Sequence, residues 1–243
     1  MKIQHLFERI GKEPKNIAKR LKKLPDYSGL SDYRRMSKLD EWIQSALSDA
    51  VLISDESKFA MVYRSNGYII RVTHRIDPGY EQWVKYSNTI KSPHVPEYYL
   101  SFRYAKTKNT VTIMEELTPL DKKTYKTVEN LWEQNFTPAV NKFIQSNASF
   151  MAVYEMVEEW SKSVRLGRHV NVFGVKAGGV RVGFDAHGDN IMKRGNTLVI
   201  TDPISYDLND LHKLNEGIDD DLSDIEIIYM NPELEQGLDD ESQ

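Results

Sequence analysis

The sequence predicts an α+β protein with a small β-rich half followed by a mainly helical half that carries hairpins. Three observations lead to this fold class. Residues 51–73 hold short β-branched runs around an Asn-Gly pair, which is a strong hairpin signal. Apolar residues recur at helical spacing between residues 120 and 165. Two further apolar runs, at 190–193 and 197–201, flank the turn-forming cluster Arg194-Gly195-Asn196.

Residues 1–50 are expected to form a helical segment ahead of the first strand. The basic run at 12–23 suits the solvated face of a helix better than a contact with RNA or an acidic partner, so we do not expect direct nucleic-acid binding. Residues 31–50 then show the apolar spacing of one helix face. That face comprises Tyr33, Met36, Leu39, Trp42, Ile43 and Leu47.

Residues 51–117 are expected to fold as a sheet with one helix. The helix is predicted at 78–88, packed on the strands through Tyr80, Trp83 and Val84. The strands are predicted at 51–54, 59–64, 68–73, 98–104 and 111–115.

Residues 118–215 are expected to be mainly helical. Thr137-Pro138 has the cap-then-proline pattern that starts a helix. A hairpin made from 169–173 and 180–184 is expected to lead into Asp185, ahead of the hairpin at 190–201. The helices are predicted at about 120–134, 138–145 and 150–164.

The residues with the clearest chemistry are Asp185, Asn190 and Asp202. Asn190 follows Asp185 by five positions and precedes Asp202 by twelve, which is the order and approximate spacing of a protein-kinase catalytic centre. Phosphoryl transfer needs a carboxylate that orients the attacking hydroxyl, and oxygen ligands that hold Mg²⁺ against the triphosphate. Asp185 would be the catalytic base, and Asn190 and Asp202 would be the metal ligands. A structural hairpin with solvated acids is the alternative.

Two stretches of sequence carry a family resemblance. Phe184-Asp-Ala-His-Gly-Asp-Asn-Ile-Met192 and Ile200-Thr-Asp-Pro-Ile-Ser205 resemble the catalytic segments of the early serine/threonine protein kinase of lytic podophages. In that family Asp-Pro-hydrophobic-Ser stands where ordinary kinases have Asp-Phe-Gly. Weaker matches lie upstream in the order that the family requires, at 58–63, 69–72 and 113–117.

The resemblance implies a minimal bilobal protein-kinase-like fold, with a small β-rich N-lobe at 51–117 and a shortened, mainly helical C-lobe at 118–215. It implies ATP and Mg²⁺ as cofactors, with the nucleotide beneath the sheet and against the linker near Glu116. It also implies host proteins as partners during host takeover, RNA polymerase and the transcription machinery among them. The expected location is the cytoplasm of the infected bacterial host.

Arg71 stands where the resemblance places the lysine that holds the α- and β-phosphates. Arginine is bulkier and forked, so the two side chains are not equivalent at a tight site. The loop expected to cover the phosphates, residues 55–58, has no glycine, and Lys58 would supply charge from it. Glu81 is the expected helical partner of Arg71, with Asp77 as the alternative. An exposed strand arginine is the other interpretation of Arg71.

Composition and charge narrow the class of protein further. With 243 residues, of which 40% are hydrophobic, the chain can bury a sizeable core, and no apolar run approaches the length of a membrane span. The absence of cysteine excludes disulfides and fits a reducing cytoplasm. From Glu216 onward there are eleven acidic residues and no Lys or Arg, so 216–243 is expected to be an acidic, solvated tail. Neither cysteines nor a His-x-x-x-His pair supports a zinc site around His187, which is expected to be structural.

The sequence therefore predicts a serine/threonine protein kinase, with two alternatives from other classes. The first is a catalytically weak pseudokinase that inhibits a host protein stoichiometrically through its acidic tail, an interpretation favoured by Arg71 and the glycine-free loop. The second is a small-molecule phosphotransferase related to antibiotic kinases, which share a comparable Asp and Asn arrangement.

Overall fold

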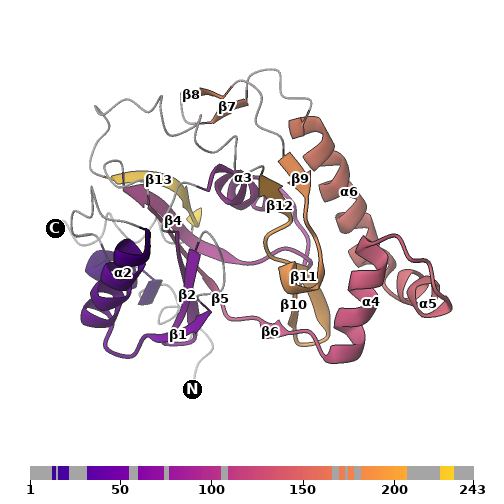
Figure 1. Ribbon diagram of the computed structural model, residues 1–243, viewed down its shortest axis with the longest axis horizontal. Coiled ribbons are helices and arrows are strands. Elements are labelled where there is room, and N and C mark those ends of the chain that lie inside the picture. The colour runs from indigo at the N-terminus through magenta and orange to yellow at the C-terminus, as the bar shows by residue number, and fades with distance from the viewer. Residues whose placement is uncertain are drawn as a thin grey trace. The chain divides into compact units, whose positions relative to one another are not determined.

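The computed structural model is α+β, as predicted, and divides into two compact units (Figure 1). Unit 1 comprises Met1–Asp77, Glu97–Glu116 and Asp219–Gln243, and unit 2 comprises Pro78–Pro96 and Leu117–Ile218. The residues that the structure describes are 13–14, 16–21, 32–54, 60–73, 77–104, 109–165, 170–172, 175–177, 182–206 and 225–232.

Unit 1 is built on a six-stranded antiparallel sheet with the order β1-β2-β3-β5-β4-β13. The strands predicted within residues 51–115 are all present, with boundaries that differ by one residue at most. The strands are β1 (Val51–Ser54), β2 (Ala60–Ser65), β3 (Tyr68–Thr73), β4 (Tyr98–Tyr104), β5 (Thr110–Glu115) and β13 (Ile225–Met230).

The Asn-Gly turn between β2 and β3 has the backbone conformation that its sequence predicts. Asn66 and Gly67 both have positive φ, at 51° and 78°, and Ser65 pairs with Tyr68 on either side of them. A two-residue hairpin turn of this kind matches the natural twist of the strands, and it requires residues that tolerate the left-handed region. The turn thus sets the register of the whole hairpin.

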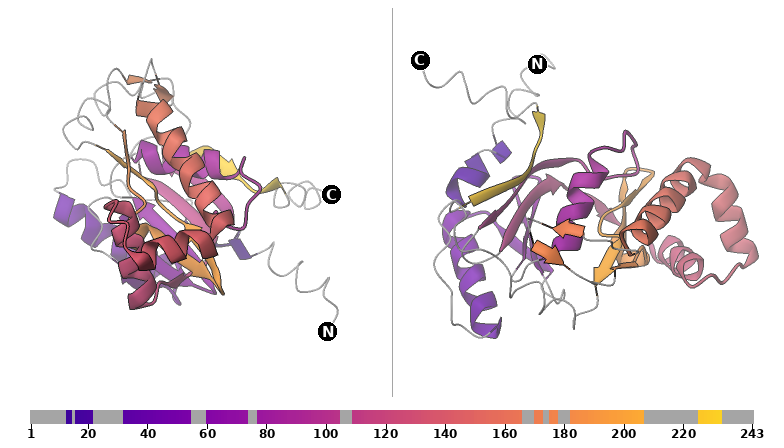
Figure 2. Two further views of the ribbon diagram at one scale, coloured as in Figure 1. Left: turned by 90° about the vertical axis from the view of Figure 1, so that its right-hand side faces the viewer. Right: turned by 90° about the horizontal axis from the view of Figure 1, so that it is seen from above.

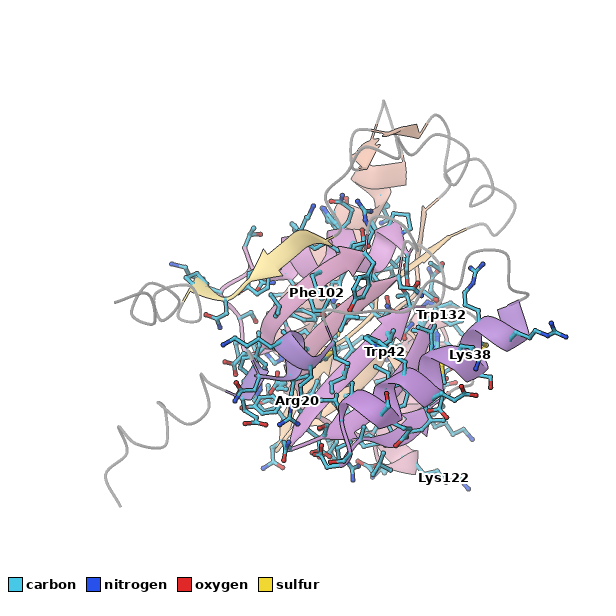
Figure 3. All side chains as sticks on the ribbon, turned by 90° about the vertical axis from the view of Figure 1, so that its left-hand side faces the viewer. Arg20, Lys38, Trp42, Phe102, Lys122 and Trp132 are labelled. Carbon is cyan, nitrogen blue, oxygen red and sulfur yellow. The ribbon has the colours of Figure 1, made fainter. Side chains whose placement is uncertain are left out.

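One face of this sheet is covered by helix α2 (Asp32–Ala46) and by the residues around Ile17 and Leu21. On the apolar face predicted for this segment, Leu39, Trp42, Ile43 and Leu47 are buried and Met36 is partly buried. Figure 3 labels Trp42 on α2 and Phe102 on β4, two residues of this core. Each large apolar side chain that is fully buried contributes about 1.5–3 kcal/mol relative to exposure, so the helix and the sheet form one hydrophobic layer.

The opposite face of the same sheet is polar although it is also buried. Alternate residues of β3, β4 and β5 place Arg71, Ser101 and Thr112 on this face. The hydroxyls of Ser101 and Thr112 lie 2.9 Å apart and satisfy each other across the strands. Buried polar groups are costly unless they are hydrogen-bonded, and the pair Ser101–Thr112 meets this requirement.

β13 lies within the segment that was expected to be an acidic tail. It pairs antiparallel with β4, with Ile225 opposite Tyr104 and a bulge between Ile227 and Tyr229, and Ile228 is buried. The run Ile225-Glu-Ile-Ile-Tyr-Met230 is rich in β-branched and aromatic residues, a composition typical of a strand. The many acidic residues at 216–243 predicted a solvated tail, so this short strand was not expected.

The described residues of unit 2 include four α-helices, all within two residues of their predicted bounds. They are α3 (Pro78–Ser87), α4 (Lys122–Trp132), α5 (Pro138–Ser146) and α6 (Ala148–Arg165). Side-chain oxygens of Asp121 and Thr137 cap α4 and α5 by accepting from backbone N–H groups of the first turn. Figure 2 shows α4, α5 and α6 as a connected group, and α5 contacts both of its neighbours. Every helix in the described residues is too short or too polar to cross a lipid bilayer.

Aromatic side chains join α3 to α6 inside unit 2. The rings of Tyr86 and Trp160 stack with centroids 4.2 Å apart and planes 5° from parallel, and Trp83 lies 6.2 Å from Trp160. Trp83 and Val84 are fully buried, as predicted, although the ring contacts of Trp83 are with Tyr86 and with α6 rather than with the predicted strands. The same helical stripe on α6 places Tyr154 against Phe184, with ring centroids 4.9 Å apart.

The hairpins of unit 2 agree only in part with the prediction. β10 (Ile191–Arg194) and β11 (Thr197–Ile200) form the expected hairpin, and β6 (Thr118–Pro119) adds to its outer edge. The hairpin predicted from 169–173 and 180–184 is wrong.

β7 (Val170–Val172) instead pairs with β8 (Val175–Ala177), and β9 (Val182–Phe184) pairs with β12 (Ile204–Tyr206). The glycines at 178–179 misled the prediction, because β7 pairs with the nearer strand β8 and β9 pairs with a strand that begins twenty residues after it ends.

Candidate functional site

The segment that carries Asp185, Asn190 and Asp202 is held together by backbone hydrogen bonds within unit 2. Asp185 directly follows β9, and its N–H donates to the carbonyl of Pro203, the residue after Asp202, at 2.8 Å. The pairing of β9 with β12, visible in Figure 1, continues from this contact. The chain on either side of Asp185 therefore lies against the chain that follows Asp202.

Asn190 ends the single 3₁₀ turn η1 (Gly188–Asn190) and closes the loop that begins at Asp185. Its side-chain Nδ2 donates to the carbonyl of Asp185 at 2.6 Å and lies 3.2 Å from His187 Nε2. Its own carbonyl accepts from both the N–H and the hydroxyl of Thr201. Since the amide nitrogen is used inside the loop, the side-chain oxygen is the atom suited to a cation.

Asp202 lies between β11 and β12, and it is partly exposed. Thr201, immediately before it, is hydrogen-bonded to Asn190, and Pro203, immediately after it, is hydrogen-bonded to Asp185. These two contacts fix the backbone on both sides of Asp202. Asp185, Asn190 and the residues that flank Asp202 are thus joined by one short network, and the hairpin between Asn190 and Asp202 is present as predicted.

The carboxylate of Asp185 lies in a partly enclosed environment. Burial raises its pKa above the ordinary value, the neighbouring His187 opposes this rise, and the negative charge of Glu129 adds to it. Its Oδ1 is 3.7 Å from His187 Nε2, and its side chain keeps 29% of its surface exposed. A carboxylate that is half-buried and still accessible has the properties of a general base.

Helix α4 supports this loop from the other side. Glu129 accepts a short hydrogen bond from the backbone N–H of Gly188, and the Tyr125 hydroxyl donates to Asp189 Oδ2 at 3.3 Å. A Cβ atom placed on Gly188 would lie 2.6 Å from the Tyr125 ring and 2.9 Å from Glu129 Oε1. Only glycine therefore allows the helix and the loop to approach this closely.

Glu129 affects both the shape of the loop and the charge of Asp185, and two substitutions separate these effects. Glu129→Gln keeps an oxygen for Gly188 but removes the negative charge that raises the pKa of Asp185. We expect the acidic limb of the pH–activity profile to move to lower pH. Glu129→Ala also removes the acceptor, and it should destabilise the protein by about 1–3 kcal/mol. Equal behaviour of the two variants in pH profiles and urea unfolding would contradict this division.

His187 lies among three carboxylates. Its ring nitrogens are 3.6–3.9 Å from oxygens of Asp185, Asp189 and Glu129, and its ring lies edge-on to Trp132. In the part of the chain that the structure describes, no three His, Cys, Asp or Glu side chains are grouped to hold a metal ion. His187 also accepts from the N–H of Asp189, so it supports the turn as a structural residue would.

The candidate nucleotide-binding residues of unit 1 are engaged with neighbouring side chains. Arg71 is buried, and its guanidinium forms an ion pair with Asp77 at 2.8 Å, the alternative partner in the sequence analysis. It is therefore not an exposed strand arginine. Glu116 forms an ion pair with Arg64 at 2.7 Å.

The other two candidate nucleotide-binding residues are Glu81 and Lys58. Glu81 is fully buried on α3, and α3 belongs to unit 2 rather than to the unit that contains Arg71. Lys58 and the loop 55–58 lie outside the described residues.

The sequence did not indicate the supporting role of Tyr125 and Glu129. They are four residues apart on a helix that was predicted, so they share a face, but nothing in their spacing pointed to a loop sixty residues away. The signal that could have indicated it is Gly188, which lies between Asp185 and Asn190, because glycine allows the backbone to approach a neighbouring element closely.

Comparison with known proteins does not assign the sequence to a family. No protein-family model matches the sequence, and no curated protein is significantly similar to it.

Proposed function

We propose that this protein is a phage-type serine/threonine protein kinase that transfers the γ-phosphate of ATP to host proteins in the cytoplasm of an infected bacterium. The observation that supports the proposal best is the network joining Asp185, Asn190 and the residues that flank Asp202. These residues have the order of a kinase catalytic centre, and hydrogen bonds of the backbone and of the Asn190 amide link the segments that carry them. The strand-rich and helix-rich halves are compatible with a minimal kinase-like fold.

Asp185 would act on the hydroxyl of the protein substrate. Its carboxylate would accept the hydroxyl proton and orient the oxygen for attack on the γ-phosphate. The raised pKa of Asp185 favours this proton transfer, because a base whose pKa is closer to the working pH is a better acceptor. The bond from Asn190 Nδ2 to the carbonyl of Asp185 would hold the base in position during the reaction.

The donor set of the site fits Mg²⁺. Asn190 Oδ1 and the Asp202 carboxylate are hard oxygen donors, the kind that Mg²⁺ prefers, and this ion usually completes its coordination with waters and substrate phosphates. When bound, Mg²⁺ would neutralise charge on the transferring phosphate. A site with one amide and one carboxylate is also compatible with the absence of a larger acidic or histidine cluster in the described residues.

A pseudokinase that inhibits a host protein is the second candidate, and one contact favours it. The guanidinium of Arg71 is bound to Asp77 and lies on a buried, polar sheet face. In a kinase the residue at this position would bind the phosphates, and a bidentate arginine is not equivalent to lysine in that role. Tight binding of a host protein without phosphate transfer would be the signature of this alternative.

Purified protein incubated with labelled ATP, Mg²⁺ and host lysate tests the proposal. We expect labelled phosphoserine and phosphothreonine in host proteins, and loss of the label in Asp185→Ala. Glu155→Gln is the matched control, since Glu155 is an exposed acid on α6 of the same unit. Label in small molecules alone would indicate a small-molecule phosphotransferase, and a bound host protein without any label would indicate the pseudokinase.

A further inference from the structure

The segment Pro93–Val95, between α3 and β4, crosses the free edge of the hairpin β10–β11 inside unit 2. The carbonyl of His94 accepts from the N–H of Ile200 at 2.9 Å. The guanidinium of Arg194, at the tip of the hairpin, donates to the carbonyls of Pro93 and Val95 at 2.9 and 3.1 Å. The segment is therefore tied to both strands of the hairpin.

The imidazole of His94 makes the contact that a neighbouring strand would otherwise make. Its Nδ1 lies 2.7 Å from the carbonyl oxygen of Leu198, and its Nε2 lies 3.0 Å from the hydroxyl of Ser149 on α6. A carbonyl oxygen can only accept, so Nδ1 carries the proton in this bond. The ring is nearly inaccessible and lies edge-on to Phe150.

These bonds satisfy backbone groups of β11 on the edge that faces away from β10. Alternate residues of an antiparallel strand direct their backbone groups to opposite edges, and here Leu198 and Ile200 face away from β10. β6 occupies the outer edge of β10, so His94 takes the place of a strand on the other edge of the hairpin. A buried carbonyl left without a donor would be costly, which makes the Nδ1–H bond a strong constraint on the path of β11.

We propose that His94 is a positioning residue for the metal site, acting through β11 on Asp202. This inference rests on the proposed function. Asp202 follows Ile200 by two residues, and the outer edge of β11 that leads to it is held by the backbone and side chain of His94. If the imidazole were lost, β11 would keep its pairing with β10 while its outer edge moved, and the Asp202 carboxylate would move with it.

Two substitutions of His94 separate its two hydrogen bonds. His94→Asn places an amide N–H the same number of bonds from Cα as Nδ1, so the donor to Leu198 is kept and the contact with Ser149 is lost. His94→Gln places its amide nitrogen at the position of Nε2, so the contact with Ser149 is kept and the donor to Leu198 is lost. Ser149→Ala is a further variant that removes only the Nε2 contact.

The readouts are the Mg²⁺ concentration for half-maximal phosphate transfer, the affinity for Mn²⁺–ATP without any transfer, and amide hydrogen exchange of residues 197–202 in the metal-free protein. We expect His94→Gln to raise the Mg²⁺ requirement and weaken Mn²⁺–ATP binding about 10-fold, and to speed exchange at 197–202. The KM for the protein substrate should not change. For His94→Asn and Ser149→Ala, the Mg²⁺ requirement and the affinity for Mn²⁺–ATP should stay within about 3-fold of wild type, because these variants lose only the bond between residue 94 and Ser149.

The outcomes distinguish this inference from the proposed function. If the wild-type protein neither binds Mn²⁺–ATP nor transfers phosphate, the proposed function fails and the role of His94 fails with it. If the wild type does both, equal metal dependence in His94→Gln and His94→Asn overturns the positioning role alone. A merely structural histidine would lower the unfolding temperature of both variants without separating their Mg²⁺ requirements.

Discussion

Asp185→Asn should abolish phosphate transfer and at the same time stabilise the folded protein at neutral pH. The loss of activity should be at least about 100-fold, since a positioned general base contributes that much or more. The gain in stability follows from the raised pKa of Asp185, whose first cause is burial of the carboxylate. Ionising this group costs free energy in the folded state, and asparagine, of the same shape, removes that cost.

The pH dependence of this effect has a definite sign. A carboxyl whose folded pKa lies above its ordinary value of 3.8 contributes stability at low pH and loses that contribution as pH rises through the folded pKa. The advantage of Asp185→Asn over wild type should therefore be absent well below pH 3.8 and grow toward neutral pH. Urea unfolding across this range measures it, with Glu155→Gln as the control for removing one exposed charge. A variant that is less stable than wild type at pH 7 would contradict the argument.

A loss of activity together with a gain in stability is the result expected when a residue that serves function is replaced. A residue kept for stability should cost stability when it is replaced, whereas a residue kept for chemistry is often held in an unfavourable environment that its replacement relieves. Asp185 is held against Glu129 and away from full solvation by the packing of the loop on α4. This electrostatically costly position supports the proposed function alongside the sequence motif.

Local sequence signals predicted most elements of the fold correctly. The Asn66-Gly67 turn, the Thr137-Pro138 helix start and the cluster at 194–196 each act through the backbone of the residues themselves, so they can be recognised without tertiary information. The spacing of Asp185, Asn190 and Asp202 could be recognised for the same reason. The hairpin that brings Asn190 beside Thr201 had its own turn signal, whereas the contact of Asp185 with Pro203 depends on the pairing of β9 with β12.

The features that were missed depend on partners distant in sequence. β9 pairs with β12 and β13 pairs with β4, and no local pattern shows which strand a short apolar run will join. The bonds of His94 to β11 and of Glu129 to Gly188 span 104 and 59 positions. A histidine in a loop and a glutamate on a helix have many possible partners, so their roles follow only from the folded structure.

Gly188→Ala should damage both the stability and the activity of the protein although it adds a single methyl group. The added carbon would lie 2.6 and 2.7 Å from two atoms of the Tyr125 ring and 2.9 Å from Glu129 Oε1, closer than real Cβ contacts allow. Relief requires the loop to move away from α4, which breaks the bond from Gly188 N–H to Glu129. Overpacking of this kind costs about 1–3 kcal/mol, and a small displacement of the base can reduce turnover about 100-fold.

A double-mutant cycle with Tyr125 tests whether the contact with its ring causes the damage from Gly188→Ala. Tyr125→Ala removes the ring that the new methyl group would meet, so the combined variant should be more stable than the sum of the two single changes, with a coupling of about 0.5–3 kcal/mol. Tyr125→Phe is the matched control, because it removes the hydroxyl bonded to Asp189 but keeps the ring, and it should give no such relief. Since Glu129 remains close to the methyl group, recovery of activity should be partial. If Gly188→Ala unfolds at the same urea concentration as wild type and transfers phosphate at the same rate, the close approach of α4 is not what holds the loop from Asp185 to Asn190.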